Sequence, residues 1–185
     1  MSTTTESPKT KVVTGEVRLS YANLWEPTAM EEGQKKKYSS AILIPKTDTK
    51  TLDKVRAAIE AASVLGKEKF GKSWVPAKLK PCLRDGDLER PEDEAYAGHF
   101  FLSAKSAQQP TMIEKNGNKI IEQEKMYSGV YAFVSLNFFP YNNVSVGVGV
   151  GLNNIMKSRD GDPFSGRTTA EEDFADLISE EDDRL

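Results

Sequence analysis

Residues 127–152 read YSGVYAFVSLNFFPYNNVSVGVGVGL, and this stretch decides the fold. In residues 127–139 the side chains alternate strictly between two faces. One face is apolar and carries Val130, Ala132, Val134, Leu136 and Phe138, while the other carries Tyr131, Phe133, Ser135, Asn137 and Phe139. Because successive side chains of a strand point to opposite sides, the pattern predicts a long strand with its apolar face in the core.

The second half of this stretch predicts a partner strand. After a turn at residues 141–143, the apolar residues Val144, Val146, Val148, Val150 and Leu152 alternate with Ser145, Gly147, Gly149 and Gly151. A strand face almost without side chains favours sharp coiling or the close approach of another backbone. The glycines do not form a phosphate-binding loop, because no Gly-Lys-Ser/Thr sequence follows them.

Three further strands are predicted upstream, at residues 12–25, 38–44 and 98–106. In the first, Val17, Leu19 and Tyr21 alternate with polar residues, which places all three on the apolar face. Trp25-Glu26-Pro27 is expected to end this strand, and Pro45 to end the second. The sequence Asn116-Gly117-Asn118 predicts a hairpin turn.

One principal helix is predicted over about residues 48–66. Thr47, Asp48 and Thr49 are capable N-caps, and apolar residues then recur at helical spacing at Leu52, Val55, Ile59 and Ala62. Gly66 or Gly71 is expected to end the helix. Residues 71–97 show no clear period and predict an ordered but irregular excursion.

These elements predict a mainly β protein with an OB-fold-like, five-stranded barrel. The helix follows the second strand, whereas the usual OB helix follows the third, and an α+β sandwich is the alternative. The domain is expected over residues 12–167, between a flexible N-terminal arm at 1–11 and an acidic C-terminal tail at 168–185.

Charged residues are distributed unevenly between this domain and the tail. The last eighteen residues hold eight acidic side chains and one basic, although the whole chain is only −3, so residues 1–167 hold 24 basic and 20 acidic side chains. The tail residues expected to bind partners are Glu171, Glu172, Asp173, Phe174, Asp176, Leu177, Ile178, Glu180, Glu181, Asp182 and Asp183. Phe174, Leu177 and Ile178 would share one side of a short helix. The alternative is a tail that only increases solubility.

The composition favours a reducing compartment. The single cysteine, Cys82, allows no internal disulfide, and no apolar run follows the polar first residues. No stretch reaches the roughly 18 apolar residues that a membrane span needs. A cytoplasmic protein without membrane partners is expected.

Aromatic and basic residues are interleaved along the domain. Single-stranded nucleic acid presents flat bases, which stack on aromatic rings, and phosphates, which attract cations. The residues proposed for DNA binding are Trp25, Lys35, Lys36, Lys37, Tyr38, Lys78, Lys80, Arg84, Phe101, Lys105, Lys125, Tyr127, Tyr131 and Phe133; Trp74 and Phe139 belong to the same compositional set. The alternative is that these aromatic residues belong to the core.

A repeated Arg-Asp-Gly-Asp sequence suggests a different chemistry. Asp85, Asp87, Asp160 and Asp162 could hold Mg²⁺, as in a nuclease or resolvase. The alternative is two turns, because Asp-Gly fits turn geometry well and the further carboxylates of a two-metal site are missing. His99 has no Cys or His partner at zinc-ligand spacing. No metal or cofactor is expected, and a protein-only adaptor remains a third possibility.

Several strings taken together resemble a family of phage and prophage single-stranded DNA-binding proteins. They are residues 18–27, 37–46, 83–87, 96–100 and 127–131, with 151–155 through 159–163. The resemblance implies non-catalytic, largely sequence-independent binding of single-stranded DNA during replication and recombination in the bacterial host cell. It also implies that the acidic tail contacts a polymerase, helicase or primase and competes with DNA. A homodimer is compatible with this design.

Overall fold

Five long strands close into a ring. The computed structural model describes residues 10–29, 31–143, 145–164, 174 and 177. The strands are β1 (Lys11–Val13), β2 (Val17–Thr28), β3 (Lys37–Pro45), β4 (Arg84–Asp85), β5 (His99–Ser106), β6 (Thr111–Ile113), β7 (Tyr131–Asn142) and β8 (Val146–Arg159). The helices are α1 (Thr49–Phe70) and α2 (Gly86–Glu89), with 3₁₀ turns at Gly71–Ser73, Pro76–Lys78, Glu94–Tyr96 and Gln123–Lys125.

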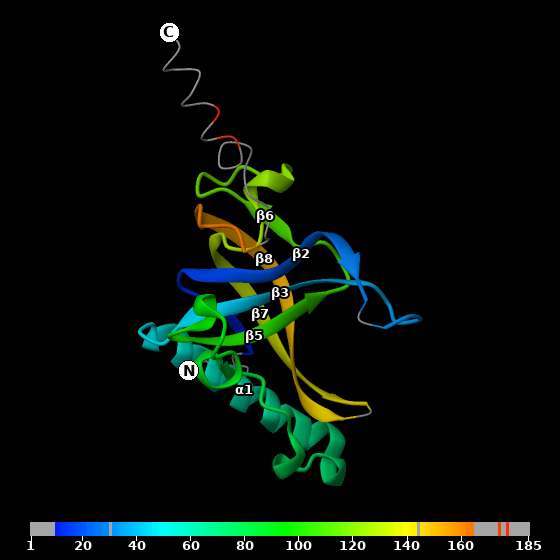
Figure 1. Cartoon of the computed structure of the whole chain (residues 1–185). Helices are drawn as coiled ribbons and strands as arrows, with labels where there is room; N and C mark the ends of the chain where they lie inside the picture. Colours follow the sequence, from blue (N-terminus) through cyan, green and yellow to red (C-terminus); the bar gives the residue numbers. More distant parts are fainter. Residues whose placement is uncertain (1–9, 30, 144, 165–173, 175–176, 178–185) are drawn as a thin grey trace, which may run out of the picture.

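The strand order identifies the barrel as an OB-fold. In the ring, β2 pairs with β3, β3 with β5, β5 with β8, β8 with β7, and β7 with β2. All these pairs are antiparallel except β5–β8, which is parallel (Figure 1). The short strands β1, β6 and β4 extend β7, β8 and β5 respectively. The predicted mainly β barrel with one principal helix is confirmed, and the sandwich is not the fold.

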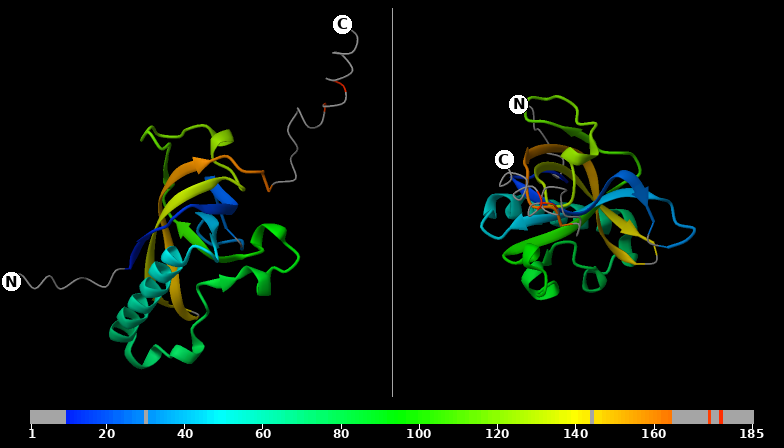
Figure 2. Two further views of the ribbon diagram at one scale, coloured as in Figure 1. Left: turned by 90° about the vertical axis from the view of Figure 1, so that its left-hand side faces the viewer. Right: turned by 45° about the horizontal axis from the view of Figure 1, so that its top comes forward.

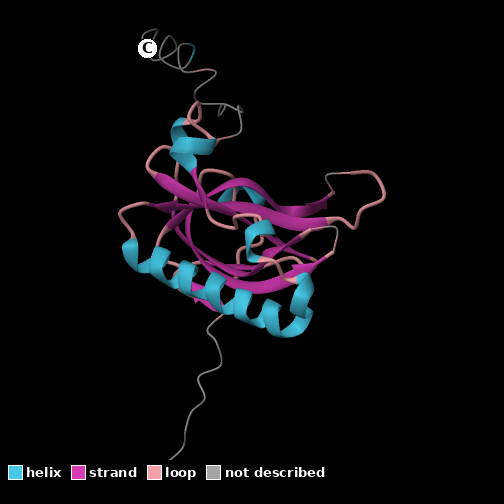
Figure 3. Ribbon diagram, turned by 90° about the horizontal axis from the view of Figure 1, so that it is seen from below, coloured by secondary structure: helices cyan, strands magenta, loops and turns pink. Residues whose placement is uncertain are grey.

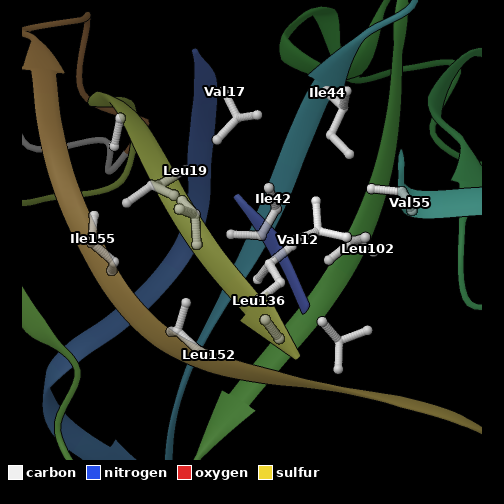
Figure 4. Packing of buried hydrophobic residues seen from close by; sticks show 14 of the residues in the cluster. Val12, Val17, Leu19, Ile42, Ile44, Val55, Leu102, Leu136, Leu152 and Ile155 are labelled. Carbon is white, nitrogen blue, oxygen red and sulfur yellow. The ribbon is translucent and has the colours of Figure 1, made fainter. Parts of the chain in front are cut away.

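The core fills the interior of this ring. Val130, Ala132, Val134, Leu136 and Phe138 are each at most 1% exposed, as the alternation of residues 127–139 predicts. Residues of the other strands, such as Leu19, Ile42 and Leu102, meet them inside the barrel (Figure 4). Full burial of one such side chain contributes about 1.5–3 kcal/mol, so the barrel is the main source of stability.

Helix α1 packs mainly against β7 and lies along one side of the barrel (Figures 2 and 3). Asp48 caps it, because its carboxylate accepts hydrogen bonds from the Thr51 backbone N–H at 3.1 Å and the Thr51 hydroxyl at 2.7 Å. The helix continues past Gly66, which Trp74 covers, and ends at Gly71, whose φ is +56°. Glycine adopts this left-handed conformation without a steric penalty.

The strand predicted at residues 12–25 is in fact two strands. β1 and β2 are separated at Thr14–Glu16, where the Thr14 hydroxyl accepts the Val134 N–H at 3.0 Å and the Gly15 N–H donates to the Thr51 hydroxyl at 2.9 Å. β2 then runs past Pro27 to Thr28, beyond its predicted end. Proline is tolerated there because pairing with β3 becomes irregular after Asn23.

The predicted orientation of Tyr21, on the apolar face of this strand, is also wrong. It is 59% exposed and has φ of +46°, the only non-glycine residue with positive φ in the described chain. The register of β2 against β3 shifts between Ser20 and Asn23. A one-residue shift turns a side chain to the opposite face of a sheet, so Tyr21 points outward although Val17 and Leu19 point inward.

The glycine face of β8 is not bare. Phe139 and Tyr141 of β7 pair with Gly149 and Gly147, and their rings occupy the space that the missing side chains leave. The expected approach of another backbone is therefore replaced by aromatic side chains from the neighbouring strand.

Both predicted termini fall almost wholly outside the described residues. Of the tail, only Phe174 and Leu177 are described, and they are 52% and 58% exposed. Among the described helices, none has both the length and the apolarity needed to cross a membrane.

Candidate nucleic-acid interface

An open groove with a volume of about 640 Å³ lies on the outer face of β2, β3 and β5. This face consists of the side chains that alternate with the core residues along β3 and β5 and therefore point outward. Ala41 pairs with Ser103, and Ser39 pairs with Lys105. Ser39, Ala41 and Ser103 have small side chains and form a low floor. The walls include Thr28 at the end of β2 and residues 29, 34 and 35 of the loop between β2 and β3.

The groove is basic. Its charged lining residues are Lys35, Lys37, Lys105, Arg84 and Arg90, and no carboxylate is among the described lining residues. Arg84 is partly neutralised, because its guanidinium binds Glu89 at 2.9 Å. That contact also raises the pKa of Arg84. The groove therefore presents cations to an anionic ligand on several sides.

Tyr21 supplies an exposed aromatic ring to this groove. The Arg90 guanidinium lies 5.6 Å from the ring centroid and donates a long hydrogen bond of 3.4 Å to the phenol oxygen. Tyr21, Asn23 and Arg90 line the groove but are not among the residues that the sequence predicts for DNA binding. The bulge that exposes Tyr21 leaves no clear signal in the sequence. Arg90 lies among the acidic residues of positions 89–94, so the sequence does not mark it as part of a basic group.

Phe101 was expected to stack on bases, but it belongs to a second apolar cluster. Leu43, Tyr96 and Phe101 are 0%, 1% and 3% exposed. Phe101 packs edge-on against Tyr96, with ring centroids 5.0 Å apart, and the Tyr96 hydroxyl donates to Ser20 Oγ at 3.1 Å. Burial raises the pKa of Tyr96. Phe101 is not available for stacking, because the excursion at residues 84–97 folds over it.

Four of the fourteen proposed residues line the groove besides Phe101: Lys35, Lys37, Arg84 and Lys105. Lys36 is an exposed neighbour in the same loop, and half-buried Tyr38 pairs with Ser106 at the next position of β3. The lysines thus lie in or beside the groove, whereas Tyr38 alternates with Lys37 and Ser39 and so points to the opposite face of β3.

The other proposed residues lie elsewhere. Trp25 donates its indole N–H to the Met126 carbonyl at 2.9 Å, which fixes the ring against the core. Tyr127 is bonded to Asp160 and Gly161 at 3.0 Å, and Lys125 lies within 3.8 Å of Glu114 and Glu122. Trp25 and Lys125 thus have structural partners on the β6–β7 connection, and Tyr127 has its partners in the segment after β8.

Tyr131 and Phe133 point outward from β7, away from the lining of the groove. The Tyr131 ring lies between two guanidinium groups, with Arg159 at 3.8 Å and Arg18 at 5.0 Å from its centroid. Half-buried Phe133 pairs with Met156 of β8. Lys78 and Lys80 are exposed on the segment after α1, where Lys80 pairs with Gly147.

The candidate Mg²⁺ site is occupied by a lysine. Lys46 Nζ lies 2.8 Å from Asp85 and 2.7 Å from Asp87, and this ion pairing lowers the pKa of both carboxyl groups. Asp160 similarly binds Lys157 at 2.7 Å. No cluster of three or more metal-ligating side chains occurs among the residues described. Asp85 instead caps α2 by accepting the Asp87 N–H.

The segment that leads to the tail is fixed beside the groove. Arg18 donates to the Gly129 and Asp162 carbonyls, both at 2.9 Å, and its guanidinium lies 4.2 Å from the Phe164 ring centroid. Phe164 also packs against the cluster of Leu43, Tyr96 and Phe101. Since Tyr96 and Phe101 border the groove, the last continuously described residue lies close to it.

The chain is similar in sequence to known phage proteins. A family model described as "Enterobacter phage Enc34, ssDNA-binding protein" matches residues 10–185. The putative protein p50 of Acyrthosiphon pisum secondary endosymbiont phage 1 is 34% identical over 184 residues, covering 95% of this chain and 98% of that protein.

Two solved structures share the fold. The single-stranded DNA-binding protein of bacteriophage Enc34, in complex with ssDNA, has a TM-score of 0.72 and 22% identity, covering 85% of this chain and 90% of the other. The single-stranded DNA-binding protein gp2.5 of bacteriophage T7 has a TM-score of 0.60 and 16% identity, covering 90% and 93%. Because the family model spans almost the whole chain, the protein belongs to the Enc34-type family of phage single-stranded DNA-binding proteins.

Proposed function

We propose that the protein binds single-stranded DNA without catalysis and with little sequence preference. The groove on β2, β3 and β5 carries the proposal, because it combines the exposed Tyr21 ring with cations and has no carboxylate in its described lining. Family membership supports the same function. The Enc34 relative was solved with ssDNA bound.

The chemistry of the groove accounts for the low sequence preference. An aromatic ring stacks on any base, and lysine or arginine side chains attract any phosphate. The floor of Ser39, Ala41 and Ser103 allows the strand to approach closely. Such binding suits the replication and recombination of phage DNA in the cytoplasm of an infected bacterium.

We further propose that the acidic tail competes with DNA for this groove and docks on a polymerase, helicase or primase. The position of Phe164 supports this role, because that residue packs against the cluster of Leu43, Tyr96 and Phe101, two members of which line the groove. Only six residues separate it from Glu171, and six extended residues reach about 20 Å. The carboxylates would act as competing anions, and Phe174, Leu177 and Ile178 would supply apolar contacts to a partner.

Fluorescence titration with oligo-dT tests DNA binding. Affinity should fall steeply between about 50 and 200 mM salt, because binding releases counterions. Duplex DNA of equal length is the control and should bind more weakly. No binding to oligo-dT at low salt would reject the function. Cleavage of the oligonucleotide with Mg²⁺ would favour the nuclease, and a partner pull-down without oligonucleotide affinity would favour the adaptor.

Deletion of residues 168–185 tests the tail. The truncated protein should bind oligo-dT more tightly than the full chain, and the difference should shrink at high salt because competition is electrostatic. A full-length control with the eight tail carboxylates changed to amides should behave like the truncation. Equal affinities of all three proteins would contradict competition. Analytical ultracentrifugation of the same proteins tests whether the chain forms a homodimer.

A further inference from the structure

The turn after α1 gathers positive charge at one end of the molecule, outside the groove. Residues 67–80 hold five basic side chains and one acidic, a net charge of +4. Residues 1–167, with 24 basic and 20 acidic side chains, also total +4, so the rest of the domain is neutral on balance. The five basic residues are all exposed and are called the basic end: Lys67, Lys69, Lys72, Lys78 and Lys80.

Packing fixes the backbone that carries the basic end. Trp74 is 6% exposed, covers Gly66 of α1 and stacks on Phe70 with the ring centroids 6.0 Å apart. Lys80 then pairs with Gly147 near the start of β8. A backbone that is already ordered loses little further freedom on binding, which suits a docking surface.

The acidic tail begins beyond the opposite end of the molecule. Arg159 at the end of β8 pairs with Tyr131 and precedes Phe164 by five residues, whereas the basic end adjoins the start of the same strand. In two views the C-terminal ends of α1 and of β8 lie at opposite ends of the barrel (Figures 1 and 2). The tail has eight acidic residues and one basic, a net charge of −7, so each copy of the chain carries opposite charges at its two ends.

The basic end and the tail also match in their apolar residues. Val64 is 51% exposed and precedes Lys67 by three residues on α1, so the two side chains are neighbours on the helix surface. In the tail, Phe174 and Leu177 are 52% and 58% exposed. An exposed apolar side chain beside lysines is complementary to a peptide whose apolar residues are flanked by carboxylates.

We propose that the acidic tail of one copy docks on the basic end of a second copy when both copies are bound to the same DNA strand. Tail carboxylates pair with the lysines, and Phe174 contacts Val64. The contact joins two different surfaces, so it can repeat from copy to copy along the strand. The proposal rests on the proposed function and deepens it, because DNA that displaces the tail from its own groove releases the tail for the neighbouring copy.

Gel-shift titration of the full-length protein tests this contact on oligo-dT of two lengths. An OB-fold occupies about 4–16 nucleotides, so lengths of about 10 and 60 nucleotides separate binding of one copy from binding of several. At about 50 mM salt, the second copy should bind the long oligonucleotide about tenfold more tightly than the first, after correction for the number of sites. Several exposed ion pairs together account for a gain of this size.

The triple variant Lys72→Gln, Lys78→Gln and Lys80→Gln removes most of the basic end. Lys67 and Lys69 are kept, because basic residues in the last turn of α1 stabilise the helix. The variant should lose the tenfold gain on the long oligonucleotide but bind the short one like the wild type.

The charge-matched control is Lys54→Gln with Lys115→Gln and Lys119→Gln, at exposed positions elsewhere on the domain. It should keep the gain. Thermal unfolding of both triple variants shows whether the fold is kept.

Mixing two defective proteins tests the pairing of the two surfaces directly. The variant without the three lysines keeps its tail, and a variant with the eight tail carboxylates changed to amides keeps its basic end. Neither protein alone should show the gain, whereas the mixture should form mixed pairs on the long oligonucleotide. Native mass spectrometry distinguishes the two proteins and counts the pairs.

Three results would overturn the proposal. They are a wild type without the gain, a folded triple variant that keeps it, and an equal loss of affinity for both oligonucleotides, which would make the basic end a DNA contact. Failure of the wild type to bind either oligonucleotide would instead reject the proposed function itself.

Discussion

Tyr21 and Arg90 meet at the groove although 69 residues separate them in the sequence. The Arg90 guanidinium also lies 5.3 Å from the Tyr96 ring centroid and 6.0 Å from that of Phe101. One cation thus links the exposed ring to the buried cluster. We infer that Arg90 holds the Tyr21 ring at the groove and contributes positive charge beside it.

Replacing Tyr21 should weaken DNA binding without lowering the stability of the fold. Tyr21→Gly should weaken oligo-dT binding about tenfold, because one base stack is lost. Its free energy of unfolding should stay equal or rise by about 1 kcal/mol, since glycine relieves the left-handed backbone conformation. Tyr21→Phe keeps the ring and should bind normally. Fluorescence titration and urea unfolding measure the two effects, and a clear loss of stability in Tyr21→Gly would contradict the interpretation of the bulge.

The salt dependence of binding should identify cations that contact phosphates. The double variant Lys37→Gln with Lys105→Gln should lower the slope of log K against log salt by about 1.4, because each contact to single-stranded DNA contributes about 0.7. Lys50→Gln with Lys54→Gln, on exposed positions of α1, is the charge-matched control and should leave the slope unchanged. Equal slopes in both double variants would show that Lys37 and Lys105 do not contact phosphates.

Arg18 should be a structural residue rather than a DNA contact. Its two hydrogen bonds to the Gly129 and Asp162 carbonyls join β2 to two distant segments. Arg18→Met should lower the free energy of unfolding by about 2–3 kcal/mol, because bonds from a charged donor are lost. Arg159→Met, which breaks an exposed pair with Glu16 and a cation–π contact with Tyr131 but no bond to a distant backbone carbonyl, should have a smaller effect. Denaturation in urea measures both, and equal losses would contradict the role of Arg18.

Lys46 should give the protein an acid-sensitive contribution to stability. The folded-state pKa of Asp85 and of Asp87 is lowered by Lys46, so their stabilisation is present above the ordinary carboxyl pKa and is lost as the pH falls through the lowered values. Lys46→Gln should therefore destabilise the protein at pH 7, and its difference from wild type should narrow below about pH 4. Unfolding at both pH values checks this, and a constant difference would show that these carboxylates are not responsible.

Period-2 patterns predicted the barrel well where the strand is regular. In β7 every inward residue follows from the alternation of apolar side chains, and the N-cap of α1 follows from Asp48. The prediction failed for Tyr21, because a backbone bulge reverses the face of one residue without changing the composition. It failed for Phe101, because burial there depends on an irregular segment that folds over the strand.

The sequence patterns indicated only some of the residues that line the candidate groove. Lys35, Lys37 and Lys105 could be placed because they sit at strand ends or in the loop between β2 and β3. The division of the aromatic residues between the core, the groove and the β7–β8 hairpin depends on which strands are neighbours. Which strands are neighbours is a property of the tertiary structure, and no local pattern in the sequence indicates it.

The closed ring has a consequence for biosynthesis. β2 pairs with β7, and the Arg18 side chain bonds to carbonyls 111 and 144 residues further along the chain. Such non-local pairings favour slow folding, on a scale of about milliseconds to seconds. The barrel cannot close before β8 has been synthesised, so we expect the nascent chain to stay without a closed core until that strand has emerged.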